Sequence, residues 1–191
     1  QVLVSTGYVA AVYPPAGIAL GAAILLGYRI WPAVAVGALI TNVLATFYAG
    51  GSPGPAVLVS VAGATMQALA GAWLARRLIE LPNPLDTPRN IGRLLFVVAP
   101  LSSLINASVS IPTLYLTGLV EPQDMLSSWG GWWLGDTLGA LVALPLMFVF
   151  LGRPASMWHG RRLTVAAPLL IIAQVVLNLL ALAAARGLLG D

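Results

Sequence analysis

Charge is the scarcest property of this sequence. Only 8% of its 191 residues are charged, and every basic residue among them is arginine because lysine is absent. A soluble chain carries about a quarter charged residues. Residues 1–28 and 30–75 have no charge at all, and 59% of the chain is hydrophobic. A water-soluble domain has too few polar side chains to cover so much apolar surface. The composition therefore predicts an all-α, polytopic membrane protein.

Cysteine is also absent, which excludes a disulfide framework and any thiolate metal site. With a single histidine, His159, and six carboxylates, we expect neither a metal centre nor a cofactor. No phosphate-binding glycine loop, nucleophile elbow or zinc-ligand spacing occurs, so we do not expect an enzyme. The arginines are scattered without a basic stripe or a stacking platform, which argues against a nucleic-acid partner.

Long apolar runs are what the chain has instead. A membrane-spanning helix needs about 20 apolar residues, and charges and Pro/Gly clusters divide the sequence into seven candidate segments. These are residues 2–13, 16–27, 32–48, 56–78, 91–116, 129–151 and 164–185. The first two are short, since twelve helical residues extend only about 18 Å, and we do not expect each of them to cross alone.

Arginine placement predicts the orientation. Eight of the nine arginines lie in or beside alternate loops, which the positive-inside rule places in the cytoplasm: Arg29, Arg76, Arg77, Arg89, Arg93, Arg153, Arg161 and Arg162. The opposite loops carry only Glu121 and Asp124. Seven crossings that begin inside end outside, so we expect a further span to be missing from this chain if a cytoplasmic part follows it.

The start of the second apolar segment has a helix-start signal. Pro14 and Pro15 suit the first positions of a helix, where a missing N–H costs little. Gly17 and Gly21 then form a small-xxx-small face that allows another backbone to approach. An alternative interpretation is a half-helix whose N-terminal dipole faces a ligand.

Residues 129–139 (WGGWWLGDTLG) are the most informative stretch. Asp136 lies about 10 Å of helix rise beyond Trp129, at a depth where an ionisable group is a functional hypothesis by default. The alternative is a protonated side chain bonded to Thr or Asn of another helix. Gly135 and Gly139 offer a second close-packing face. Trp132 and Trp133 fit either an interfacial belt or the wall of a ligand site.

Three other polar side chains, Asn42, Gln67 and Asn106, fall in three further spans. Together with Asp136 they could converge on one polar pocket. The alternative is interhelical hydrogen bonding, which contributes about 0.6 kcal/mol for each bond. The stretch from Asn106 to Pro112 also favours a loosened helix, unwound or re-entrant.

Three blocks in succession resemble a known family. They are residues 13–21 (YPPAGIALG) with 25–38 (LLGYRIWPAVAVGA), residues 64–78 (ATMQALAGAWLARRL) and residues 132–139 (WWLGDTLG). Their order resembles the first type of bacterial membrane-associated sensor (MASE) domain, although Tyr13 stands where the family often has Trp. The resemblance implies about eight spans in the full domain, in the inner membrane, N-terminal to a cytoplasmic histidine kinase or diguanylate cyclase.

On this interpretation residues 1–191 form one sensory domain without its output domain. Its expected partners are the bilayer, an unknown small ligand or membrane protein, and a second copy in a homodimer. The ligand-binding candidates are Asp136, Trp132, Trp133, Asn42, Gln67 and Asn106. The competing class is a small-molecule transporter or its substrate-binding membrane subunit, favoured by short Pro/Gly-interrupted helices and midplane polar groups. The lack of an internal repeat and the scarcity of carboxylates argue against it.

Overall fold

The computed structural model describes residues 12–48, 50–79, 87–152 and 171. Almost all of the first predicted segment and nearly the whole of the last lie outside the described residues, as do His159, Arg153, Arg161 and Arg162. Within the described part every regular element is helical, which confirms the predicted all-α class at that level.

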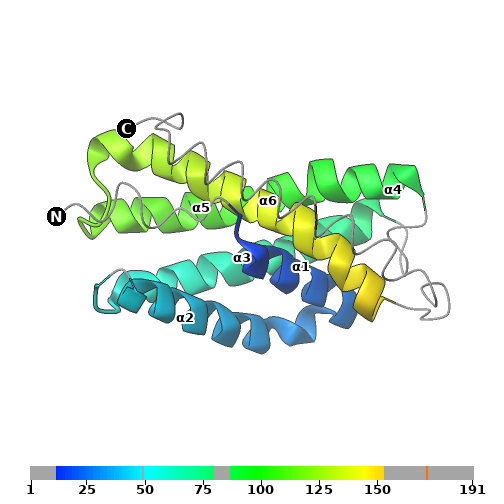
Figure 1. Cartoon of the computed structure of the whole chain (residues 1–191), viewed down its shortest axis with the longest axis horizontal. Helices are drawn as coiled ribbons and strands as arrows, with labels where there is room; N and C mark the ends of the chain where they lie inside the picture. Colours follow the sequence, from blue (N-terminus) through cyan, green and yellow to red (C-terminus); the bar gives the residue numbers. More distant parts are fainter. Residues whose placement is uncertain (1–11, 49, 80–86, 153–170, 172–191) are drawn as a thin grey trace.

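A short helix and four long ones make up this part (Figure 1). Helix α1 covers Pro14–Leu26, and the 3₁₀ turn η1 (Tyr28–Ile30) leads from it into α2, Trp31–Tyr48. Helix α3 covers Pro55–Leu78. Helices α4 (Pro88–Arg93) and α5 (Ala99–Leu116) are joined by a π-helical turn, η2, at Leu94–Val98. A 3₁₀ turn, η3 (Pro122–Asp124), then begins α6, Met125–Leu151.

Four of these stretches are long and apolar enough to cross a membrane: Tyr28–Tyr48, Pro55–Leu78, Pro88–Leu116 and Pro122–Leu151. They coincide with four of the seven predicted segments. Helix α1 has only 13 residues, or about 20 Å of helix. The second segment is therefore too short to cross by itself, as its length predicts.

The expectation of an unwound stretch between Asn106 and Pro112 is wrong. Helix α5 runs through Pro112 without a break. The irregular turn lies earlier, at Leu94–Val98, directly before Pro100. Proline has no N–H for the carbonyl four residues before it, and the wider π-turn falls where Pro100 leaves that gap. Prolines are tolerated in membrane helices where neighbouring groups satisfy the freed backbone.

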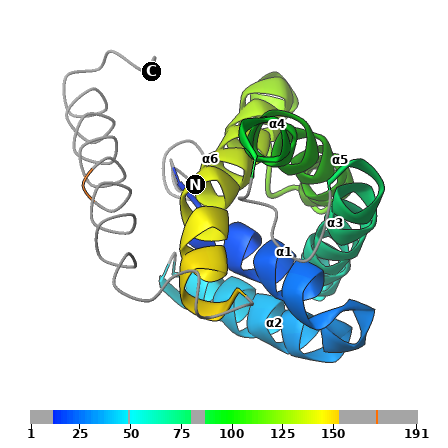
Figure 2. The same cartoon turned by 90° about the vertical axis from the view of Figure 1, so that its right-hand side faces the viewer.

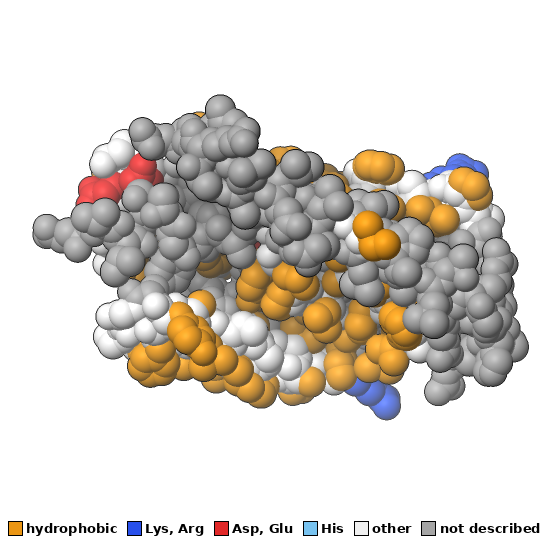
Figure 3. All heavy atoms as spheres, in the orientation of Figure 1, with side chains coloured by type: hydrophobic (Ala, Val, Ile, Leu, Met, Phe, Trp, Pro, Cys, Tyr) orange, Lys and Arg blue, Asp and Glu red, His pale blue; other side chains and the backbone are white. Residues whose placement is uncertain are grey.

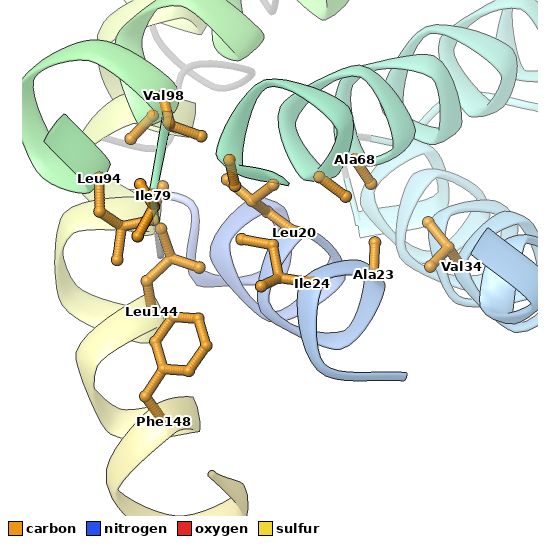
Figure 4. Packing of buried hydrophobic residues seen from close by; sticks show 14 residues of the cluster. Leu20, Ala23, Ile24, Val34, Ala68, Ile79, Leu94, Val98, Leu144 and Phe148 are labelled. Atoms are coloured by element: carbon orange, nitrogen blue, oxygen red, sulfur yellow. The ribbon is translucent and has the colours of Figure 1, made fainter. Parts of the chain in front are cut away.

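Helix α1 is one of four helices that pack in a closed order. It packs on α6 and α3, while α3 packs on α5 and α5 on α6, so that these four form a ring when seen end on (Figure 2). Helix α2 lies outside the ring against α3. Buried apolar side chains of α1, η2 and α6 fill one part of the interior (Figure 4); they include Leu20, Ile24, Leu94, Val98, Leu144 and Phe148.

The two ends of the bundle differ in charge. The described arginines lie in η1, in the last turn of α3 and in α4, which meet at one end. Glu121 and Asp124 lie in the turn between α5 and α6, at the other end, and Figure 3 shows red and blue side chains at opposite ends of the molecule. Large apolar side chains are exposed on the surface between the ends, among them Ile40, Leu44, Leu58 and Phe96. This surface is suited to contact with lipid.

Two arginines at the basic end also close helix C-termini. Arg76 donates to the carbonyls of Ala23 and Ile24 at 3.3 and 3.1 Å, and its guanidinium lies 5.2 Å from the centre of the Tyr28 ring. Arg93 donates to the Leu78 carbonyl at 2.8 Å. The last four carbonyls of a helix have no partner within the helix, and a cation there also offsets the helix dipole. The end of α1 is thereby attached to α3, and the end of α3 to α4.

Replacing Arg76→Gln should therefore lower the thermal midpoint of the chain in detergent. The variant loses two charge-assisted hydrogen bonds to α1, for which we expect a loss of about 1–2 kcal/mol in the free energy of unfolding. Arg29→Gln removes the same charge from an exposed site at the same end and should change stability by less than about 0.5 kcal/mol. Equal losses in the two variants would show that the contact with α1 contributes nothing.

Candidate functional site

Helix α3 presents two glycines and a glutamine to α5 at four-residue spacing. A Cβ at Gly63 would lie 2.8 Å from Asn106 Oδ1, and a Cβ at Gly71 would lie 2.9 Å from the Cβ of Ser102. The absence of side chains at these two positions lets α3 and α5 approach closely. Gln67, between them, is only 2% exposed and donates through Nε2 to Ser103 Oγ in a long bond of 3.4 Å.

The facing side of α5 is a row of small polar residues. Ser103, Asn106 and Ser110 are all buried, at the spacing of one helix face. Ser103 donates to the Ala99 carbonyl of its own helix at 2.9 Å, and Ser110 donates to Asn106 Oδ1 at 3.0 Å. Asn106 in turn donates through Nδ2 to Asp136 Oδ2 at 2.9 Å. The row thus links the faces of α5 and α6.

Asp136 lies near the middle of α6 and is 4% exposed. Its bond from Asn106 connects it to the same face of α5 that accepts, one turn earlier at Ser103, the bond from Gln67. Three of the predicted ligand-site residues, from three different helices, therefore meet. We call the set Gln67, Ser103, Asn106, Ser110 and Asp136 the Asp136 cluster.

Helix α1 begins beside this cluster. The Tyr13 N–H donates to the Gly135 carbonyl at 2.9 Å, one residue before Asp136. A Cβ at Gly139 would overlap the Tyr13 carbonyl, and a Cβ at Gly17 would lie 2.6 Å from the Gly139 carbonyl oxygen. The seam continues at Gly21, where a Cβ would lie 3.1 Å from the Cβ of Met147. Gly17, Gly21 and Gly139 therefore lie where α1 and α6 approach most closely, while Gly135 contributes its backbone carbonyl.

The two prolines solve a problem of this arrangement. A helix N-terminus leaves four N–H groups without an intrahelical partner, and such groups are costly inside an apolar bundle. Pro14 and Pro15, the first residues of α1, have no N–H to bury. Ala16 donates to the Tyr13 carbonyl at 3.2 Å. Pro14 is exposed and Pro15 is half-buried, so α1 begins at the surface of the bundle, against α6, without leaving unpaired donors at these two positions.

Two of the three tryptophans of α6 form hydrogen bonds to α5. Trp133 is half-buried and donates through Nε1 to the Pro100 carbonyl at 2.9 Å. Trp129 stacks on Trp133, with ring centres 6.2 Å apart, and donates to Ser108 Oγ at 3.1 Å. Trp132 is half-buried as well. Trp129 and Trp133 therefore hold α6 against α5 near the Asp136 cluster.

Asn42 is not brought into this set. It is only half-buried and donates through Nδ2 to the Ala38 carbonyl of its own helix α2 at 2.8 Å. Helix α2 packs chiefly on α3, outside the ring that surrounds the cluster. The neighbouring Thr41 instead accepts a hydrogen bond from the Tyr13 hydroxyl at 3.1 Å.

Sequence reasoning did not single out Tyr13, Ser103, Ser110 or Thr137 as site residues. Ser103 and Ser110 could have been found from their positions three before and four after Asn106, which place all three on one helix face. Thr137 is 7% exposed, and its hydroxyl has no hydrogen-bond partner among the described residues. Tyr13 carries no comparable signal, because its position depends on where α1 meets α6.

Comparison with known proteins identifies the family. The family model MASE1 matches residues 1–189, nearly the whole chain. Searches of curated proteins and of solved structures gave no match. MASE1 is a family of membrane sensor domains without catalytic activity of their own, and the four long apolar helices agree with a membrane location. The chain therefore belongs to the MASE1 family, the first type of membrane-associated sensor domain.

Proposed function

We propose that residues 1–191 are the sensory input domain of a bacterial signalling protein, embedded in the inner membrane, and that the Asp136 cluster receives the input. One observation carries the proposal: a carboxylate is buried where α6 packs on the polar face of α5, one residue after the carbonyl that accepts from the Tyr13 N–H at the start of α1. Ionisable groups inside membrane helices are expensive and are retained for function. Family membership supplies the sensory role.

Signalling at such a site is a shift between helix arrangements. The Asn106–Asp136 bond joins α5 to α6, and the Gln67–Ser103 bond joins α3 to the same face of α5. A small molecule that pairs with Asp136 in place of Asn106 changes how α5 and α6 pack. Trp132 and Trp133 line the same stretch of α6 as candidates for contact with it.

The basic end of the bundle faces the cytoplasm in this proposal, as the positive-inside rule predicts. A helix rearrangement then reaches a histidine kinase or diguanylate cyclase domain there. Outputs of these kinds work in pairs, so the proposal includes a homodimer of the whole protein. Subunit rotation and helix shifts at an interface are established ways of switching such assemblies.

A transporter, or the substrate-binding membrane subunit of one, is the second candidate. A short helix that begins against α6, beside its buried carboxylate, is the feature that favours it, because short and discontinuous helices form transporter sites. Flux of a tested solute into proteoliposomes, lost in Asp136→Asn, would support transport. Binding without flux is expected of a sensor.

A thermal-shift screen in detergent tests the sensory proposal. The panel comprises metabolites, quinones and lipids, and the proteins are the wild type, Asp136→Asn and Glu121→Gln. A compound at one hundred times its dissociation constant stabilises the native state by about 2.7 kcal/mol. We expect at least one compound to stabilise the wild type and the Glu121→Gln control, whose altered side chain lies in the exposed turn before α6, but not Asp136→Asn.

A compound that stabilises all three proteins equally would place the input elsewhere than at the Asp136 cluster. If nothing in the panel stabilises the wild type, and Asp136→Asn melts lower by itself, Asp136 is a structural residue. The input then arrives through a membrane partner or the bilayer.

A further inference from the structure

The two serines of the Asp136 cluster fix the direction of its hydrogen bonds. Ser103 gives its hydroxyl proton to the Ala99 carbonyl, so it can only accept from Gln67, and the amide must turn Nε2 toward it. Ser110 gives its proton to Asn106 Oδ1, so Asn106 turns Nδ2 toward Asp136. Both amides are therefore oriented by their neighbours. The amide oxygen of Gln67, Oε1, then has no hydrogen-bond donor among the described residues.

The groups left without partners are oxygens. Gln67 Oε1 is buried and has no donor among the described residues, and neither does the hydroxyl oxygen of Thr137, next to Asp136. A buried polar atom without a partner costs about 1–3 kcal/mol. Asp136 itself accepts from the neutral amide of Asn106, and the described arginines lie at the end of the bundle. Within the described part of the chain, no positive charge therefore faces this carboxylate.

The donor set decides which cation fits. Carboxylate, amide and hydroxyl oxygens are hard ligands, which suit alkali and alkaline-earth ions, whereas transition metals favour imidazole and thiolate. No group of three or more His, Cys, Asp or Glu side chains gathers among the described residues. One carboxylate balances one positive charge, and so the composition favours a monovalent ion.

We propose that the Asp136 cluster binds one Na⁺ ion, held by the Asp136 carboxylate, Gln67 Oε1 and the Thr137 hydroxyl. This inference rests on the proposed function and deepens it, because it names the class of ligand that the same site takes. A bound Na⁺ places a positive charge beside Asp136 and weakens the hydrogen bond from Asn106 to Asp136. Sodium binding is thereby linked to the packing of α5 on α6.

A sodium titration of thermal stability tests the site. The purified chain in detergent is melted in NaCl and choline chloride mixtures of constant ionic strength and constant pH. We expect the wild-type midpoint to rise with Na⁺ and to saturate, and the rise to vanish in Asp136→Asn. Glu121→Gln, altered in the exposed turn before α6, should respond as the wild type does.

A matched pair at Thr137 keeps the test sharp if Asp136→Asn folds poorly. Thr137→Val keeps the shape and removes the oxygen, and should raise the apparent dissociation constant for Na⁺ about tenfold. That factor corresponds to about 1.4 kcal/mol. Thr137→Ser keeps the oxygen and should stay within about twofold of the wild type, a difference of about 0.4 kcal/mol. Isothermal titration with NaCl gives the same constants independently of unfolding.

Three results would overturn the sodium site: no effect of Na⁺ on the wild type, an equal effect in Asp136→Asn, or a midpoint that follows pH alone. Tyr13, whose hydroxyl donates to Thr41 of α2, is the other titratable group near Asp136 among the described residues, and Tyr13→Phe separates its contribution. If a compound from the screen stabilises the protein through Asp136 while Na⁺ has no effect, the sodium site is wrong and the proposed sensory role stands. The sensory role is tested separately by the distance between two spectroscopic labels, one on α5 and one on α6. If Na⁺ binds but leaves this distance unchanged, the sodium site stands and the proposed sensory role of the cluster does not.

Discussion

Gly139→Ala is expected to unfold the contact between α1 and α6 and to lower the free energy of unfolding by about 3 kcal/mol or more. Overpacking of a close interior costs about 1–3 kcal/mol even where side chains can give way. Here the added Cβ would overlap the backbone carbonyl of Tyr13. Relief requires moving the start of α1, which also breaks the bond from the Tyr13 N–H to the Gly135 carbonyl. Denaturant or thermal unfolding in detergent measures the loss.

Two glycines elsewhere in these helices serve as matched controls. Gly37 in α2 and Gly130 in α6 have nothing within 4 Å of an added Cβ. Alanine there should be neutral or should stabilise by up to about 1 kcal/mol, since glycine is the poorer helix former. If Gly139→Ala and Gly130→Ala unfold at the same temperature, the close contact of α1 with α6 at Gly139 does not contribute to stability.

Asn106→Leu should be the most damaging change in the polar cluster, with an expected loss of about 3 kcal/mol. It removes the donor at 2.9 Å from Asp136 and leaves a buried carboxyl without that partner, at a cost of about 1–3 kcal/mol or more for a charged group. It also removes the acceptor of Ser110. Asp136→Leu should cost less, because the group left behind is a neutral amide.

A double-mutant cycle then measures the interaction itself. The Asn106→Leu/Asp136→Leu protein leaves neither partner unpaired and should be less destabilised than the sum of the single changes by about 1–3 kcal/mol. Asn42→Leu is the control, since that amide bonds only to its own helix and is half-buried. Single effects at residues 106 and 136 that add to within about 0.5 kcal/mol would mean that the two side chains do not interact.

Much of this fold follows from the sequence because of the cost of burying charge in a membrane. The apolar runs between arginines and Pro/Gly clusters predict α2, α3, the α4–α5 rod and α6 to within a few residues, and Pro14–Pro15 predicts the start of α1. The π-turn at Leu94–Val98 was missed. Its position depends on how the helix accommodates Pro100, which no periodicity records.

The site was predicted in part, for a related reason. Polar groups in apolar helices must find partners, so Gln67, Asn106 and Asp136 could be expected to gather, and the structure brings all three to one face of α5. Asn42 shows the limit of that argument, because an amide can also satisfy itself with the carbonyl four residues earlier. Which face a helix turns inward depends on its neighbours. The contact between Tyr13 and Gly135 also depends on how neighbouring helices pack, and the hydrophobic pattern of the sequence does not predict it.

The attachment of α1 at its two ends makes it a strut between two levels of the molecule. Its beginning is bonded to α6 beside Asp136, and its end is held by Arg76 of α3 at the basic end. A helix of 13 residues is a stiff rod of about 20 Å. A displacement of α6 at Gly135 is therefore delivered, through the backbone of α1 and the Arg76 side chain, as a push or a pull on the last turn of α3, about 20 Å away.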